Sequence, residues 1–245
     1  AQWVAFVIAL LLCLRYYRRL WKRKSFRVPS FLLLLRQAVT PGTASNRQNF
    51  SLFLRTLCLI VVHFMFIAAG AAQGSVELAV NTLLMQLFTI FSYFMDGFAY
   101  AGEALVGKAI GAANGGLCRA VVRRLFQWGG GLAMLFVGLY AIGGESFMSL
   151  LTDDITVLDA VSRYRHWTLL LPICGVASFL WDGIYIGATL PRLMLWSMAI
   201  SMSLFLAGYY LLIPLYGNHG LWIAFLSYLA CRGMVLTLTR GKILS

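Results

Sequence analysis

Two carboxyl groups, Asp96 and Glu103, stand seven positions apart in an apolar stretch, with Tyr100 between them. Because seven residues on an α-helix return to nearly the same face, the three side chains share one stripe, where two carboxyl groups could share or relay a proton. An ionisable residue inside an apolar span is costly, so Asp96 is a candidate functional residue. Glu103 is a second candidate, although its place near the end of the stretch could let it reach water.

A third carboxyl group, Asp182, lies in another apolar stretch beside Trp181 and Tyr185. A buried aspartate needs a partner or a bound proton. Such a group suits a site that binds a proton or sodium ion in one conformation and releases it in another; the alternative is a hydrogen bond between helices. Trp181, Tyr185 and Tyr100 could line a cavity, although aromatic residues in such stretches more often serve packing.

Three further polar residues could support these carboxylates. Arg55 either extends its charged end to the membrane interface or is the counter-ion of Asp96 or Asp182. Asn81 is a candidate for hydrogen bonding across helices. His63 is more central and is more often a core residue than a titrating one.

The sequence carries no pattern typical of an enzyme, a cofactor or a metal site. Residues 102–109 resemble a phosphate-binding loop, but Ala109 lacks the required hydroxyl and the preceding run is too long and apolar for a core strand. The 5 cysteines are odd in number and widely spaced, which favours packing roles over disulfides. We therefore expect neither catalysis nor a bound cofactor.

The composition is that of a helical membrane protein. Of 245 residues, 61% are hydrophobic and only 11% are charged, which excludes an ordinary soluble domain and a disordered chain. Since a membrane-spanning helix needs about 20 apolar residues, we expect six complete spans, at residues 50–72, 78–102, 125–143, 167–187, 193–216 and 219–239. Pairs of small residues such as Gly97/Ala101 and Gly107/Gly111 are expected to let helices approach closely.

Basic residues, 20 against 8 acidic, give a net charge of +12 and collect in alternate connections between the spans. Lys and Arg mark the cytoplasmic side, so the alternation predicts a multi-pass protein with its first connection and its C-terminus in the cytoplasm. The basic residues between positions 15 and 36, interleaved with aromatics, could bind nucleic acid. A cytoplasmic connection beside anionic lipid explains them better, so we expect the lipid bilayer and no nucleic acid as partner.

The sequence begins inside an apolar run, which suggests the C-terminal part of a longer protein. We expect residues 1–14 to end a truncated transmembrane helix, residues 15–49 to form a basic cytoplasmic linker, and residues 50–245 to form a six-helix lobe.

Several motifs together resemble the multidrug and toxic compound extrusion (MATE) family, in its DNA-damage-inducible protein F (DinF) branch. The longest runs from Asp96 to Ala112 (DGFAYAGEALVGKAIGA), and further matches follow in order over nearly the whole chain: Leu54–Thr56, Ala79–Asn81, Leu171–Pro172, Trp181–Thr189, Gly217–Trp222 and Arg232–Gly233. Asn114 departs from the acidic residue expected after the longest motif.

The resemblance implies an all-α fold of twelve helices in two lobes, of which this chain would hold the second lobe and the end of the preceding helix. It places Asp182 on the tenth helix, where other branches carry a coupling aspartate, and Asp96 and Glu103 on the eighth. The first-helix aspartate thought to matter for proton coupling in this branch has no counterpart, because the N-terminal lobe is missing.

The resemblance also implies efflux of small organic, often cationic, compounds in exchange for protons or sodium ions. A lipid-linked flippase of the same superfamily would need several basic residues facing its cavity, and the sequence places few there. A membrane subunit without transport activity would need no buried carboxylates.

Overall fold

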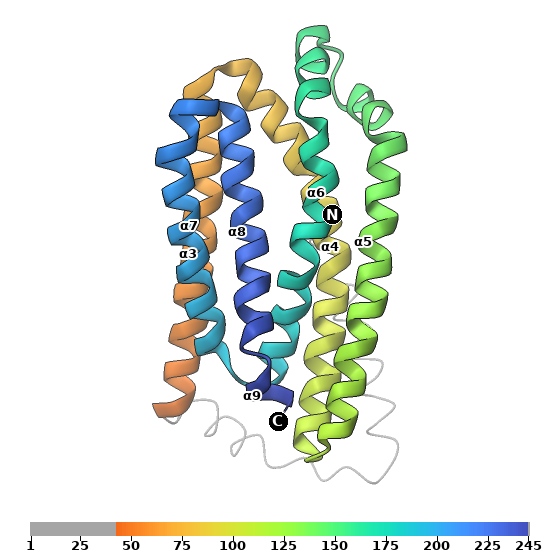
Figure 1. The fold of residues 1–245 in the computed structure, drawn as a ribbon, viewed down its shortest axis with the longest axis vertical. Coiled ribbons are helices and arrows are strands. Elements are labelled where there is room, and N and C mark those ends of the chain that lie inside the picture. Colours follow the sequence, from red (N-terminus) through yellow and green to blue (C-terminus); the bar gives the residue numbers. More distant parts are fainter. Residues whose placement is uncertain (1–42, 245) are drawn as a thin grey trace, which may run out of the picture. The chain divides into compact units, whose positions relative to one another are not determined.

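The computed structural model describes residues 43–244, which form helices joined by short turns (Figure 1). The expected segment 1–14 and most of the expected linker 15–49 lie outside this range, and residues 43–49 are the first residues of the first described helix. In order, the helices are α3 (Thr43–Gln73), α4 (Ser75–Gly111), α5 (Gly115–Leu151), α6 (Ile155–Gly187), α7 (Pro191–Tyr216), α8 (Asn218–Leu238) and α9 (Gly241–Leu244). Packing is described below for residues 47–244.

Six of these helices, α3 to α8, are long and apolar enough to cross a membrane, which confirms the predicted fold class. Most are longer than the predicted spans, and α4, α5 and α6 continue through the charged residues that flank the apolar stretches. Lys, Arg and Glu are good helix formers, so charge at the membrane surface ends an apolar run without ending the helix.

The connections are correspondingly short, and local chemistry explains where the helices stop. Gly217, with φ of 53°, separates α7 from α8 in a conformation that glycine adopts without strain. The Asn114 side chain accepts a hydrogen bond from the Leu117 amide at the start of α5. Asp154 caps α6 through the Thr156 amide and hydroxyl, and these hydrogen bonds lower the pKa of the Asp154 carboxyl group.

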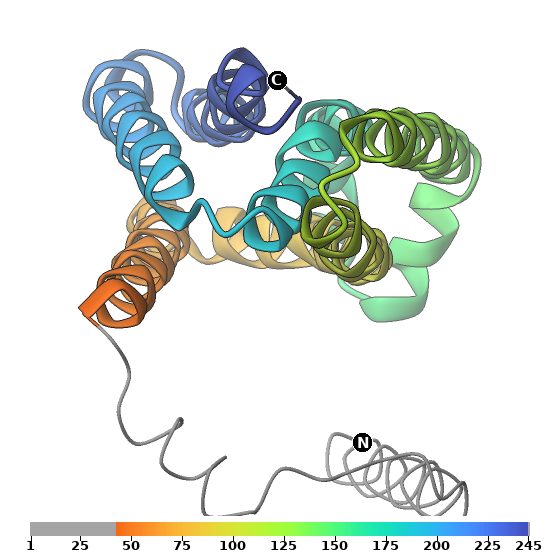
Figure 2. The same cartoon turned by 90° about the horizontal axis from the view of Figure 1, so that it is seen from below.

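Two helices, α6 and α8, are the most buried of the bundle, and in Figure 2 α6 lies between α5 and α8. In their most apolar stretches 56% of the residues are buried, compared with 17% in α3 and α7. An aromatic cluster around Phe66, Trp222 and Phe225 joins α3 to α8, and α6 also packs on α4 and α5. The outer helices turn long apolar side chains outward, as a bilayer requires; on α3 these include Phe50, Phe53, Leu57, Ile60, Phe64 and Ile67.

Two helix backbones touch where α6 crosses α4. A Cβ atom built on Gly183 would overlap the carbonyl oxygen of Ala99, and one on Gly187 would lie 2.5 Å from that of Glu103. Two glycines four residues apart therefore let the helices touch, as small residues do in membrane bundles. The expected pairs contribute less, since a Cβ on Gly97 or Gly111 would meet nothing within 4 Å.

This contact predicts opposite outcomes for two Gly→Ala substitutions. Gly183→Ala must push α4 and α6 apart and is expected to destabilise the protein by at least about 1–3 kcal/mol. Gly97→Ala, the matched control on α4, fills open space and should leave stability unchanged or raise it by up to about 1 kcal/mol. Thermal unfolding of the purified full-length protein in detergent measures both; equal shifts for the two variants would contradict the assigned contact.

Candidate functional site

A cavity of about 460 Å³ lies among α3, α4, α6 and α8. Its walls are apolar near Phe88 and Phe179, but its polar lining brings together side chains that are far apart in the sequence. These polar residues are Arg55, His63, Thr89, Ser92, Asp96, Tyr100, Glu103, Asp182, Tyr228 and Arg232. The cavity thus gathers all three predicted carboxylates together with Arg55 of α3 and Arg232 of α8.

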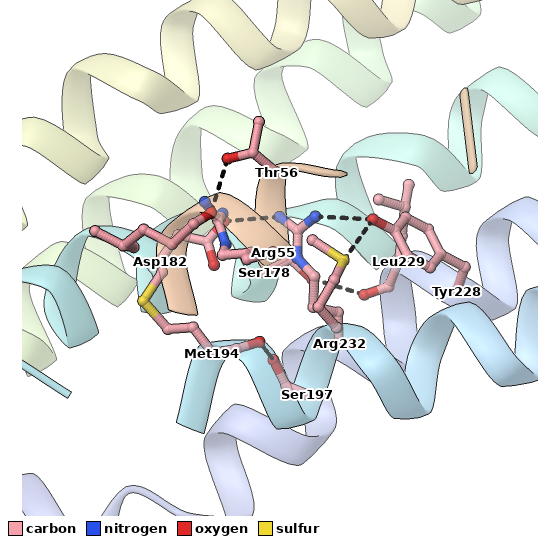
Figure 3. A network of polar contacts seen from close by, with 11 residues as sticks. Arg55, Thr56, Ser178, Asp182, Met194, Ser197, Tyr228, Leu229 and Arg232 are labelled. Atoms are coloured by element: carbon pink, nitrogen blue, oxygen red, sulfur yellow. Dashed lines mark hydrogen bonds and ion pairs between the residues drawn. The ribbon is translucent and has the colours of Figure 1, made fainter. Parts of the chain in front are cut away.

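Asp182 is the centre of the polar network (Figure 3). Arg55 of α3 and Arg232 of α8 both donate to its Oδ2 atom, the latter at 2.9 Å. Only 12% of the Asp182 side chain and 4% of the Arg232 side chain are exposed, so the charges are paired away from water. Of the two roles considered for Arg55, its position in the structure is that of the counter-ion of Asp182.

Arg232 is held on several sides. Its Nη1 atom donates to the Tyr228 hydroxyl at 3.4 Å, and its guanidinium carbon lies 5.8 Å and 5.9 Å from the ring centroids of Phe179 and Tyr228. One turn away from Asp182, the Ser178 hydroxyl donates to the carbonyl oxygen of Leu229 at 2.6 Å, which also ties α6 to α8. Arg232 is therefore fixed by aromatic contacts as well as by its ion pair.

The second oxygen of Asp182, Oδ1, has no hydrogen-bond partner within residues 43–244, and neither has Nε of Arg232. A buried carboxylate oxygen without a donor is unfavourable unless something else supplies one. Asp182 lines the cavity, but its Oδ1 atom is itself buried, so this arrangement leaves one carboxylate oxygen without a donor within residues 43–244.

Asp96 lines the same cavity from α4, together with Tyr100 and Glu103 of the predicted stripe. Asp96 is half-buried, and its carboxyl group makes no hydrogen bond or ion pair with the described part of the chain. Asp96 and Asp182 thus have different surroundings, because one carboxyl group has two cationic partners and the other has none in this range.

Two of the three aromatic residues considered for the cavity lie elsewhere. Tyr100 lines it, but Trp181 and Tyr185 are buried at the side of α6 that faces α5 and the end of α8. Trp181 donates to the Thr237 hydroxyl at 2.7 Å, and the Tyr185 hydroxyl lies 2.8 Å from the carbonyl oxygen of Leu236. Their neighbours in the sequence, Asp182 and Gly183, face the cavity because adjacent residues on a helix point in different directions.

Asn81 also lies away from the cavity, in a buried contact between α4 and α8. Its amide nitrogen donates to Asn218 Oδ1 at 2.7 Å, and its oxygen accepts from Asn218 Nδ2 at 3.0 Å and from Trp222 Nε1 at 2.9 Å. The structure therefore gives Asn81 the role of bonding across helices.

Arg232 and Tyr228 were not among the residues singled out from the sequence for a role in the site. Arg232 had a usable signal, because it is a charged residue inside an otherwise apolar run of about 20 residues, where such residues are rare and paired. Tyr228 had none, since a tyrosine in a membrane span is ordinary.

Comparison with known proteins decides the family. A profile of the MatE family matches residues 50–211. The chain belongs to the MatE family. Relatives of this MatE chain include DNA damage-inducible protein F of Escherichia coli strain K12, which is 40% identical over 188 residues, covering 77% of this chain and 41% of the relative.

More distant relatives are plant proteins. Protein DETOXIFICATION 42 of Arabidopsis thaliana is 23% identical over 195 residues, covering 77% of the chain and 37% of the relative. The MatE chain thus spans about two fifths of the length of the curated proteins it matches. The family predicted from the sequence motifs, a group of multi-pass membrane transporters, is confirmed.

The ion pairs predict a rank order of stability. Asp182→Asn leaves two guanidinium groups without a counter-charge and is expected to cost about 3–5 kcal/mol. Arg55→Gln should cost less, because Asp182 keeps Arg232 and Arg55 is the more exposed of the two. Combining Asp182→Asn with Arg232→Gln should recover part of the loss, which a double-mutant cycle on thermal unfolding of the full-length protein measures. Additive effects would argue against the pairing.

The amide contact predicts a purely structural role for Asn81. Asn81→Ala removes three hydrogen bonds and leaves Trp222 and Asn218 with unpaired buried groups, so a loss of about 1–3 kcal/mol is expected. Asn81→Asp, which keeps the shape and the acceptor, should retain part of the stability at a pH that keeps it neutral. Activity per folded molecule is expected to stay at the wild-type level in Asn81→Ala; a specific loss of transport at normal stability would contradict this role.

Proposed function

We propose that this MatE chain is one lobe of a secondary active transporter that exports small organic, often cationic, compounds in exchange for a coupling ion. The observation that carries the proposal is the cavity with two unlike aspartates, one paired twice and one free of partners in the described range. In this proposal, residues 50–245 form the second lobe, a preceding lobe of the same protein completes the transport path, and the transporter sits in a bacterial inner membrane with its C-terminus in the cytoplasm.

A coupling ion must bind one conformation of the transporter more tightly than the other. A ligand shifts a conformational equilibrium only by the difference between its affinities for the two states. Asp182, with two guanidinium groups on one oxygen, is already compensated and offers a cation little gain. Asp96 feels the charges of both arginines across the cavity but forms an ion pair with neither, and uptake of a proton there changes the charge balance of the whole cavity. We therefore assign ion binding to Asp96, with Glu103 as a relay on the same stripe.

The same geometry favours a proton over sodium. A sodium ion needs several oxygen ligands close together, as hard cations do, and at Asp182 the neighbouring positions are taken by Arg55 and Arg232. Protonation of Asp96 needs only one oxygen atom and its water or hydroxyl neighbours. Asp182 then has a structural role, because its ion pairs with Arg55 and Arg232 hold α3 and α8 against α6. Tyr100 contributes an aromatic surface for an organic substrate.

A flippase for lipid-linked compounds is less well supported. Such a protein would need free basic side chains to bind phosphate in the cavity, and both arginines that line it are paired with Asp182. The paired carboxylate equally disfavours a subunit without transport activity, since a buried charge cluster is costly to maintain.

Transport by the full-length protein in proteoliposomes tests the assignment. With ethidium as the probe, wild-type efflux should follow an imposed proton gradient and not a sodium gradient. Asp96→Asn should lower the rate at least about tenfold at equal incorporation. Asp153→Asn, an exposed residue in the turn before α6, is the matched control and should transport normally.

Three results would separate the alternatives. Full activity of Asp96→Asn would overturn the role of Asp96, and activity driven by sodium alone would overturn the choice of ion. Transport abolished only by Asp182→Asn in a stably folded protein would return the coupling role to Asp182.

A further inference from the structure

A second cavity, of about 750 Å³, lies on the other side of α6, between the first turns of α5 and the C-terminal end of α8. None of the residues that line it lines the first cavity. Its walls are one face of α5, the indole of Trp181 on α6, and the segment from Thr237 to Arg240. It is therefore a separate space and not an extension of the site around Asp182.

The mouth of this cavity is strongly basic. Arg119 and Arg123 stand one helical turn apart on α5, and Arg240 follows the end of α8. All three side chains are exposed, and no acidic residue of the described chain lines the cavity. Three guanidinium groups converging from two helices are suited to a phosphate group, which arginine binds through two parallel hydrogen bonds.

The inner part of the cavity is apolar. Val122 and Phe126 also line the cavity from α5, Val122 between the two arginines in the sequence and Phe126 about one turn beyond Arg123. Trp181 is buried and packs against Phe126 with the ring planes tilted by 57° and the ring centroids 5.1 Å apart, and its indole nitrogen donates to the Thr237 hydroxyl. The rings therefore offer an apolar surface with no unpaired donor, directly beyond a cationic entrance.

We propose that this cavity binds an anionic phospholipid, with the headgroup phosphate held by Arg119, Arg123 and Arg240 and the start of an acyl chain against Phe126 and Trp181. A free phosphate would use only the entrance and gain nothing from the rings. A lipid fits both parts, because α5 is a membrane-spanning helix whose outer face carries exposed Trp128, Met134 and Leu135. Basic pockets between transmembrane helices recognise anionic headgroups in this way.

The bound lipid would link two parts of the bundle. Since α5 packs on α4 and α6, a phosphate shared by Arg119, Arg123 and Arg240 connects the start of α5 with the end of α8. The alternation of basic connections places this end of both helices in the cytoplasmic leaflet, where anionic lipids are available. The lipid site does not depend on the proposed transport activity, and lipid binding is measured separately from transport.

Native mass spectrometry of the full-length protein in detergent tests the site. Phosphatidylglycerol is added as the anionic probe, phosphatidylcholine as the zwitterionic one, and inorganic phosphate is titrated separately by calorimetry. The triple variant Arg119→Gln/Arg123→Gln/Arg240→Gln should bind phosphatidylglycerol at least about tenfold more weakly than wild type. The matched control, Lys108→Gln/Arg124→Gln/Arg192→Gln, removes three exposed charges outside the cavity and should bind normally.

A variant without a charge change guards against misfolding of the triple variant. Ala120→Trp fills the mouth of the cavity and is expected to weaken phosphatidylglycerol binding while thermal unfolding without lipid stays as in wild type. Equal loss in the triple variant and its control would show general charge attraction and overturn the site. Binding of inorganic phosphate that depends on the same arginines, with no preference for phosphatidylglycerol, would replace the lipid by a free anion and also overturn the proposal.

Discussion

The structure depends on compensating one negative charge that is buried within a membrane-spanning bundle. Hydrocarbon offers no water to solvate Asp182, so the carboxylate must find positive partners within the protein. Arg55 and Arg232 supply them from two helices that are distant in the sequence. This requirement brings α3, α6 and α8 to one point and thereby creates the cavity that Asp96 and Glu103 line from α4.

That convergence is possible only because α6 lies directly against α4. Gly183 and Gly187 remove the side chains that would hold the two backbones apart, and Gly183 adjoins Asp182 in the sequence. The segment from Asp182 to Gly187 therefore carries both the buried charge and the glycines that let α6 approach α4, the helix that bears Asp96 and Glu103. On the opposite side of this segment, Trp181 and Tyr185 anchor α6 to the end of α8 by hydrogen bonds.

How much of this could be predicted from the sequence differs between features. Length and hydropathy were enough for the six spans, and local spacing was enough to place Asp96, Tyr100 and Glu103 on one stripe. Helices α4 and α5 extend beyond the predicted spans at both ends, and α6 at its start, because charged residues at the membrane surface end an apolar run without ending the helix. Other features depend on which helix is the neighbour, and a single sequence does not give that. Spacing alone therefore favours Gly97/Ala101, whereas the close contact is at Gly183 and Gly187. For the same reason the sequence could not exclude Trp181 and Tyr185 from the cavity or place Arg232 in it.

The two guanidinium groups bind the same oxygen of Asp182, and this has a mechanical consequence. A fork with two parallel bonds would fix the plane of each arginine to that of the carboxylate, whereas bonds meeting at a single atom constrain distance far more than angle. Oδ2 of Asp182 thus fixes how far α3 and α8 lie from α6, while the angle between α3 and α8 is set by other contacts, such as those of Phe66 with Trp222 and Phe225.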